Sequence, residues 1–200
     1  MWKLFENTDI SLFYLINRGG QNTFFDLIMP IISNINYFLI PIGLFWFFLV
    51  LKKDIKTRTV AVIILLLIGV SNLVNSNVLK PVFQRPRPYK VMSDVHYYKK
   101  HNWQITSKID KTKRVKKNSF PSSHAVNIFA AAFFLSYYFR KFWPFFYFIA
   151  VLVGYSRIYL GVHYPFDVIA GAVEGTLFGI MFVWISNQTI IFLEKRIAFR

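Results

Sequence analysis

The sequence contains no cysteine and few acidic residues. Without cysteine the chain forms no disulfide and no thiolate metal site. Nine Asp and Glu stand against 24 Lys and Arg, which gives a formal charge of +15. This excess predicts an anionic membrane surface as a partner, and we expect no nucleic-acid partner. The sequence leaves the oligomeric state open.

Charged residues of all kinds are scarce for a chain of 200 residues, at 16%, whereas 55% of the residues are hydrophobic and 20% aromatic. Several apolar runs approach the roughly 20 residues that a helix needs to cross a bilayer. We therefore predict an all-α, polytopic transmembrane bundle of about five to six spans with a long basic loop on the side of the active site. The clearest spans are expected at about 36–51, 57–80, 122–139, 143–160 and 165–190.

The chain is predicted to be one membrane-embedded domain over residues 1–200. Its expected parts are N-terminal spans in 22–83, the basic loop in 84–120 and catalytic spans in 121–192. A short interfacial helix over 9–17, capped by Thr8 or Asp9, is expected before them. Residues 22–34 form a second short helix in this prediction, and whether it crosses the membrane is left open.

Successive spans cross the membrane in opposite directions. The second and fourth spans therefore end on the side of the membrane where the third and fifth spans begin. Three polar clusters fall on that side. The other side carries basic residues on short loops and the tail, which predicts that it is cytoplasmic. The loop at 80–120 also holds twelve Lys and Arg, which weakens this argument. The residues that argue for a cytoplasmic face are Lys52, Lys53, Lys56, Arg58, Arg140, Lys141, Lys195, Arg196 and Arg200.

The first cluster closes the second span with the sequence KPVFQRPRP, from Lys80 to Pro88. Asn72, Ser76 and Lys80 are spaced by four and share one face of an α-helix. Cations held by prolines suit a phosphate, because the planar Arg fork donates two hydrogen bonds to one oxyanion. The alternative is a basic helix end that reaches lipid headgroups.

The second cluster is PSSH, residues 121–124, at the start of the third span. Ser122 and Ser123 precede a helix, whose free N–H groups and positive dipole end attract anions. The alternative is an ordinary serine N-cap. That alternative leaves His124 unexplained, because the dipole disfavours a charged imidazole in the first turn.

The third cluster lies between the fourth and fifth spans and contains Arg157, His163 and Asp167. The spacing of four brings Asp167 close to the imidazole of His163 if the helix already includes that histidine. A carboxylate at one ring nitrogen fixes the tautomer and leaves the other nitrogen as a nucleophile. The alternative is a structural ion pair between Arg157 and Asp167.

Together the clusters combine two histidines, several cations and a helix N-terminus with Asp167 as their only acid. One acid is too few for a metal hydrolase, so we expect no metal and no other cofactor. The residues fit metal-independent phosphoryl transfer. One histidine would attack phosphorus, the other would protonate the leaving oxygen, and the cations would stabilise the remaining oxygens.

The three clusters resemble, in order, the KxxxxxxRP, PSGH and SRxxxxxHxxxD motifs of the type 2 phosphatidic acid phosphatase superfamily. The resemblance implies a helical bundle of a bacterial cell membrane with its site at the periplasmic or outer face. It implies a phosphohistidine on His163, which Asp167 orients, and His124 as the acid and later the base. It also implies a phosphate site made of Lys80, Arg87, Ser122, Ser123 and Arg157.

Ser123 departs from this pattern, since the family has glycine there. We expect activity to survive, with Ser123 donating an extra hydrogen bond in the pocket. Arg85 is not one of the fixed residues of the motif, and we expect it to be a supporting cation or a headgroup cation. Glu174, seven residues past Asp167, would either support the site or bond to a neighbouring helix.

Two further segments carry expectations of their own. Gly171, Gly175 and Gly179 form a ladder at every fourth residue, which predicts close helix packing. The segment 96–117 mixes Tyr, Trp and Lys and is either a lid that gathers anionic lipid or a solvated loop. His96 and His101 are expected on its surface.

The predicted function is hydrolysis of a phosphate or pyrophosphate on a membrane lipid. The substrates considered are undecaprenyl pyrophosphate, phosphatidylglycerol phosphate, phosphatidic acid and the 1-phosphate of lipid A, and the basic loop favours lipid A. A vanadate-type haloperoxidase shares the pocket chemistry but has no need of a bilayer. A transporter or binder of anionic lipids is the alternative from another class.

Overall fold

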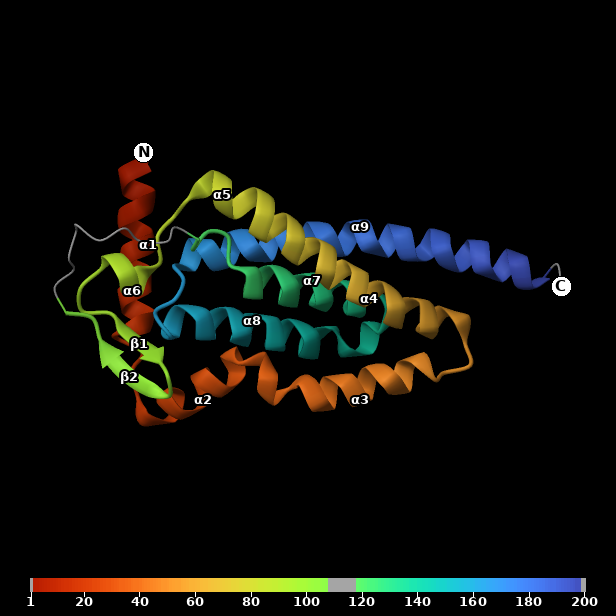
Figure 1. Cartoon of the computed structure of the whole chain (residues 1–200), viewed down its shortest axis with the longest axis horizontal. Coiled ribbons are helices and arrows are strands. Elements are labelled where there is room, and N and C mark those ends of the chain that lie inside the picture. The colour runs from red at the N-terminus through yellow and green to blue at the C-terminus, as the bar shows by residue number, and fades with distance from the viewer. Residues whose placement is uncertain (1, 108–117, 199–200) are drawn as a thin grey trace.

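The computed structural model describes residues 2–107 and 118–198, with side chains from residue 5 onward. Four helices lie side by side along the length of the molecule (Figure 1). They are α4 (Ile55–Val74), α7 (Ser123–Tyr138), α8 (Trp143–Tyr159) and α9 (Pro165–Ala198). A further pair follows the outside of the bundle, because α2 packs on α8 and α3 on α4. This pair is α2 (Thr23–Ser33) and α3 (Leu39–Val50).

The remaining elements are short or gather at one end of the bundle. Helix α1 runs across that end, roughly perpendicular to the bundle axis (Figure 1). A π-helical turn continues α4 directly into α5, and α6 and a two-stranded hairpin follow in the long loop. The bounds are α1 (Trp2–Asn17), η1 (Ile35–Tyr37), η2 (Asn75–Leu79), α5 (Lys80–Phe83), α6 (Pro88–Val91), β1 (His96–Lys99), β2 (Asn102–Ile105) and η3 (Arg140–Phe142).

The helical membrane architecture is confirmed. Three helical stretches of the described chain have the length and composition to cross a membrane: Ile55–Val91, Arg140–Tyr159 and Pro165–Ala198. Large apolar side chains point outward along the bundle, among them Ile40, Leu65 and Trp184, which are 76%, 53% and 65% exposed. Water would penalise this surface, whereas lipid does not.

Specific residues set the helix ends that matter for the site. Asp54 caps α4, because its Oδ2 accepts from the Thr57 N–H at 2.8 Å. Pro165 opens α9 at the first helical position, where its missing N–H costs nothing. Gly161 ends the turn after α8 with a φ of +72°, and a Cβ there would lie 2.8 Å from the carbonyl oxygen of His96. The turn therefore requires glycine and delivers the next residues to the end of the bundle.

The polar face predicted for the second span, with Asn72 and Ser76, is wrong by one residue. Ser71 and Asn75 are buried, whereas Asn72 and Ser76 are exposed. In the π-helical turn the N–H of Lys80 bonds to the carbonyl of Asn75, five residues back. The extra residue rotates the next turn of the helix, so Lys80 continues the line of Ser71 and Asn75.

The long loop contains a hairpin that the sequence had not indicated. Its turn residues Lys100 and His101 have φ values of +48° and +65°, as in a type I′ turn. His101 is exposed as predicted. The same prediction for His96 is wrong, because its ring stacks on Trp103 at a centroid distance of 4.1 Å and is buried. Residues 108–117 of the proposed lid lie outside the described residues.

The N-terminal helix begins at Trp2, earlier than predicted, so neither Thr8 nor Asp9 caps it. Asp9 lies in the middle of α1 and is 1% exposed. Its Oδ1 accepts from the N–H of Phe166 in α9 at 2.9 Å. The acid that resembled a helix cap is therefore a tertiary contact.

The glycine ladder of α9 packs directly on α7, as predicted. A Cβ on Gly175 would lie 2.2 Å from the carbonyl oxygen of Val126, and one on Gly171 would lie 2.7 Å from that of Ser122. Backbone atoms offer no room to move, so these glycines fix the distance between α7, which carries His124, and α9, which begins shortly after His163.

We expect Gly175→Ala to destabilise the protein by about 1–3 kcal/mol, because the methyl group overpacks the α7–α9 contact. Gly69→Ala is the matched control in α4, where a Cβ meets nothing within 4 Å. Thermal unfolding of both variants in detergent, followed by tryptophan fluorescence, measures the difference. Equal midpoints for the two variants would contradict the packing role.

Candidate functional site

The three predicted clusters meet at the end of the bundle that α1 crosses (Figure 1). The Lys80 Nζ donates to the Ser123 Oγ at 2.7 Å, which joins the first cluster to the second. The Ser122 N–H donates to the Asp167 carbonyl at 3.0 Å, which joins the second to the third. The alternation of spans thus predicted correctly which helix ends come together.

The third cluster presents a buried histidine beside a buried carboxylate. His163 is 2% exposed and Asp167 is fully buried, and the His163 Nδ1 lies 3.4 Å from the Asp167 Oδ2. The same carboxylate oxygen accepts from the Ser119 hydroxyl at 2.5 Å and from the Tyr164 N–H at 3.0 Å. With Nδ1 turned to the carboxylate, the Nε2 of His163 is left for chemistry.

Burial lowers the pKa of His163 to about 4, although its contact with Asp167 acts in the opposite direction. The imidazole is therefore neutral near pH 7. A neutral ring with a free Nε2 lone pair is a competent nucleophile.

Two arginines and a serine bring unpaired donors to the same place. Arg157 Nε, Arg87 Nε and Ser122 Oγ are buried and have no hydrogen-bond partner in the described part of the chain. Another nitrogen of Arg157, Nη1, donates to the Ser33 hydroxyl of α2, which fixes the guanidinium. Buried polar groups are rarely left unpaired, so these donors are suited to a ligand rich in acceptors.

The positive charges of this site act on one another. The charges of Arg87 and Arg157 both act on Lys80, and that of Arg87 also acts on Arg157. Like charges held together away from water are costly. An anion between them would remove that cost.

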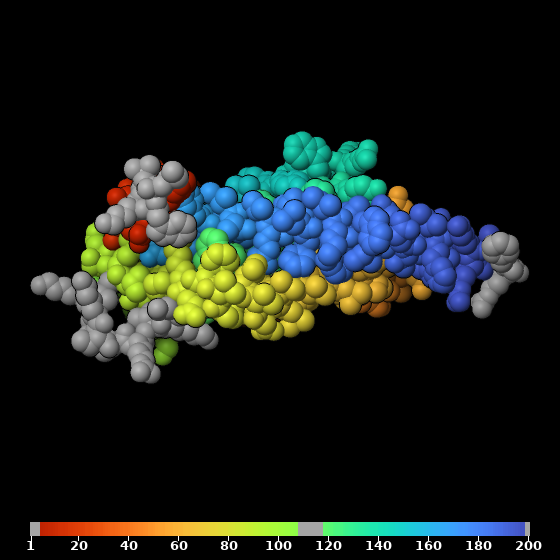
Figure 2. All heavy atoms as spheres, turned by 90° about the horizontal axis from the view of Figure 1, so that it is seen from above, coloured from red at the N-terminus to blue at the C-terminus, as the bar shows by residue number. Residues whose placement is uncertain are grey.

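His124 lies in the first turn of α7 and is exposed. It interacts electrostatically with His163 and with all three cations, Lys80, Arg87 and Arg157. Seen from above, the segment that leads into α7 is visible between α5 and α9 at this end of the molecule (Figure 2). The second histidine is therefore at the accessible side of the site and His163 at its closed side.

Ser122 occupies the N-cap position of α7, but its side chain makes no capping bond. Its carbonyl accepts from the Val126 N–H at 3.0 Å, so the backbone alone begins the helix. The alternative of an ordinary serine cap does not account for this hydroxyl, which remains unpaired among the described residues.

Ser123 uses its hydroxyl within the protein. Besides accepting from Lys80, it donates to the Asn75 Oδ1 at 2.8 Å. The Asn75 Nδ2 in turn donates to the Glu174 Oε2 at 2.9 Å. Glu174 therefore bonds to a neighbouring helix, and the side chains of Asn75 and Ser123 connect it to Lys80 of the first cluster.

The sequence left the role of Arg85 open between a supporting and a headgroup cation, and it did not indicate the partners of this arginine. Arg85 pairs with Asp167 at 2.7 Å and with Asp9 at 2.6 Å, and its side chain is only 24% exposed. Arg85 rather than Arg157 thus makes the ion pair with Asp167, and it points inward rather than to the headgroups. Ser119 and Ser33 were missed as well. The spacing of residues within the third cluster does not indicate Arg85, Ser119 or Ser33 as partners, because these residues lie far from that cluster in the sequence.

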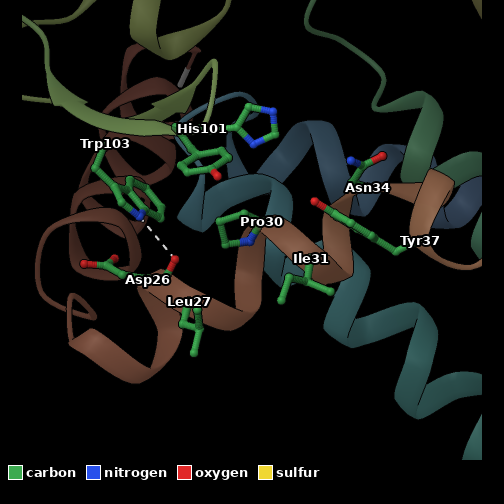
Figure 3. Close-up of a pocket in the computed structure, with 9 residues that line it drawn as sticks. Asp26, Leu27, Pro30, Ile31, Asn34, Tyr37, His101 and Trp103 are labelled. Carbon is green, nitrogen blue, oxygen red and sulfur yellow. Dashed lines mark hydrogen bonds between the residues drawn. The ribbon is translucent and has the colours of Figure 1, made fainter.

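A separate pocket of about 290 Å³ lies between α2 and the hairpin. The Trp103 Nε1 donates to the Asp26 carbonyl across it at 3.1 Å (Figure 3). None of the predicted site residues lines this pocket. Its walls are formed by Asp26, Leu27, Pro30, Ile31, Asn34, Tyr37, Tyr98, His101 and Trp103.

Among the described residues, no group of three or more His, Cys, Asp or Glu side chains lies close enough to hold a metal ion. Asp9 and Asp167 both pair with Arg85.

Solved structures resemble this chain over most of its length. LpxE from Aquifex aeolicus superposes with a TM-score of 0.64 at 28% identity, over 87% of this chain and 93% of that one. A transmembrane PAP2-type phosphatidylglycerolphosphate phosphatase from Bacillus subtilis gives 0.63 at 25% identity, over 92% and 87%.

Sequence relatives agree with the structures. A lipid A 4′-phosphatase from Porphyromonas gingivalis is 33% identical over 84% of this chain and 69% of its own length. The bacitracin transport permease protein BcrC from Bacillus licheniformis is 28% identical over 90% and 81%. A lipid A 4′-phosphatase from Bacteroides thetaiotaomicron is 41% identical over 38% of this chain, and the match spans only 35% of that protein.

The PAP2 superfamily profile matches residues 59–191, which include all three clusters. The chain therefore belongs to the PAP2 superfamily, the family of membrane lipid phosphatases that its motifs resemble.

Proposed function

We propose that this protein hydrolyses a phosphate from a membrane lipid without a metal, through a phosphohistidine on His163. One observation carries the proposal: a neutral, carboxylate-oriented histidine shares a site with unpaired donors of Arg87, Arg157 and Ser122. The donors suit the oxygens of a phosphate, and the histidine suits its phosphorus atom.

In the first step the Nε2 of His163 attacks phosphorus in line with the lipid oxygen. The P–O bond to the lipid breaks as the P–N bond forms. His124, whose protonated form the negative charge of the bound phosphate stabilises against the neighbouring cations, gives its proton to the departing oxygen. Asp167 stabilises the positive charge that develops on the ring of His163.

In the second step His124, now neutral, takes a proton from water. The resulting hydroxide attacks phosphorus, the P–N bond breaks, and phosphate leaves with His163 restored. Lys80, Arg87 and Arg157 stabilise the equatorial oxygens in both steps, and the N–H groups at the start of α7 assist them. Ser123 holds Lys80 in this proposal and leaves two of its three ammonium protons for the phosphate.

The proposed membrane arrangement has five crossings, with α2 and α3 together forming one and α4, α7, α8 and α9 the others. The whole chain forms one domain, with residues 84–120 as the loop beside the site. The short basic loops face the cytoplasm, so the site faces the periplasm or the outside of a bacterial cell membrane.

A transporter or lipid binder is the rival function. It would use the cations for capture and would require neither an oriented histidine nor a second histidine beside it. Turnover that depends on His163 separates the two functions.

We expect His163→Ala to lower the rate of phosphate release by roughly 10⁴-fold or more, as is usual when a nucleophile is removed. His101→Ala is the matched control, because that histidine is exposed in the hairpin turn. Release from purified protein in excess EDTA is the measurement, and we expect wild-type activity to survive the chelator. A wild type that requires a metal, or a His163→Ala variant as active as wild type, would refute the mechanism.

For the substrate we propose the phosphate of lipid A, in line with the named activity of the Porphyromonas relative. Lys90, Lys99 and Lys100 lie in the loop beside the site, and each basic residue near an anionic surface adds about 1 kcal/mol of attraction. We therefore expect kcat/KM to be at least about tenfold higher for lipid A than for phosphatidic acid. Undecaprenyl pyrophosphate and phosphatidylglycerol phosphate complete the panel in the same micelles. Equal or faster turnover of phosphatidic acid would exclude this preference.

A further inference from the structure

Arg85 connects the carboxylate of Asp167 to a second buried carboxylate, that of Asp9 in α1. Its Nη1 donates to the Asp167 Oδ1 at 2.7 Å and its Nη2 to the Asp9 Oδ2 at 2.6 Å. The guanidinium lies over the ring of Tyr164, with Cζ 3.8 Å from the ring centroid. Two hydrogen bonds and one stacked ring leave this side chain a single position.

Asp9 holds a second part of the same site. Its Oδ1 accepts from the Phe166 N–H at 2.9 Å, one residue before Asp167. That N–H belongs to the first turn of α9, where backbone donors have no partner within the helix. Asp9 therefore fixes both the backbone that carries Asp167 and the arginine that holds its carboxylate.

We propose that Asp9 and Arg85 are positioning residues of the phosphatase, and that α1 thereby completes the catalytic site. Arg85 holds Oδ1 of Asp167, so that Oδ2 faces the Nδ1 of His163. The inference rests on the proposed function, because it assumes that His163 needs its orientation for chemistry. Arg85 occupies one of the unspecified positions of the KxxxxxxRP motif, and Asp9 lies outside the segment 59–191 that the family profile matches.

The charges around Asp167 make the role of Arg85 testable. His163 and Tyr164 come from the turn before α9, and Arg85 comes from the segment after α5. Lys80 of α5 and Asp9 of α1 also act on Asp167 electrostatically. Without the arginine, two buried carboxylates would share this space with no hydrogen-bonded cation between them. Such a pair keeps one proton near neutral pH, and a protonated Asp167 orients His163 less well.

The experiment compares the pH dependence of kcat for wild type, Arg85→Gln, Asp9→Asn and the double variant on one lipid substrate. We expect Arg85→Gln to lower kcat by about 100-fold with little change in KM, because the nucleophile is misplaced whereas the phosphate site is intact. The loss in kcat should grow as the pH falls from 8 to 6.

The double variant should have a higher kcat than Arg85→Gln at pH 6, because removing the second carboxylate lets Asp167 ionise again. Asp9→Asn alone should lower kcat, and Arg85→Lys should fall between wild type and Arg85→Gln.

Glu6→Gln provides the matched control, since it makes the same acid-to-amide change on an exposed position of α1. Asp9→Asn that behaves like Glu6→Gln would overturn the role of α1, and this variant decides the matter if Arg85→Gln does not fold. An Arg85→Gln variant that changes only KM would overturn the role of Arg85. The same conclusion would follow if the fold-loss in kcat of the double variant equalled the product of the losses of the two single variants. If the wild-type protein shows no turnover, the proposed function fails as well. If the wild type is active and the variants give any of the contradicting results above, only the positioning role fails.

Discussion

The positive charge of Lys80, Arg87 and Arg157 is the constraint on which the rest of the structure depends. Three cations in a site shielded from water repel one another, so the fold must hold them at some cost until an anion arrives. Rigid helix contacts provide that hold. Glycines lock α9 to α7, and Ser33 of α2 fixes the guanidinium of Arg157. The unpaired donors that remain indicate what kind of molecule the site accepts.

Local features of the backbone determine where the residues of the site lie. The π-helical turn rotates Lys80 into line with Asn75, so that Ser123 can bridge them. Gly161 lets the chain reverse after α8 and seats His163 at the closed side of the site. The buried environment keeps that histidine neutral, as a nucleophile must be. Each feature is small, but together they place His163 within electrostatic range of Arg157 and Arg87.

The sequence predicted the three clusters, their common side and the packing glycines, because helix period and alternating spans are local rules. It failed where a partner lies far along the chain. Asp9 was mistaken for a helix cap, and Arg85 was left open between a supporting and a headgroup cation, since their spacing carries no sign of a contact across roughly 80 to 160 positions. The face of Asn72 and Ser76 was wrong for another reason: one residue inserted into a helical turn leaves no signal in a periodic pattern.

The proposed mechanism requires a covalent phosphohistidine at His163, and trapping this intermediate is the most direct test. Wild-type protein mixed with a lipid carrying a ³²P-labelled terminal phosphate and quenched in alkali within milliseconds should retain acid-labile, alkali-stable label. Peptide mapping should place that label on His163, and His163→Ala should carry none. Phosphate release by a wild type that never becomes labelled, or label on another residue, would contradict the account.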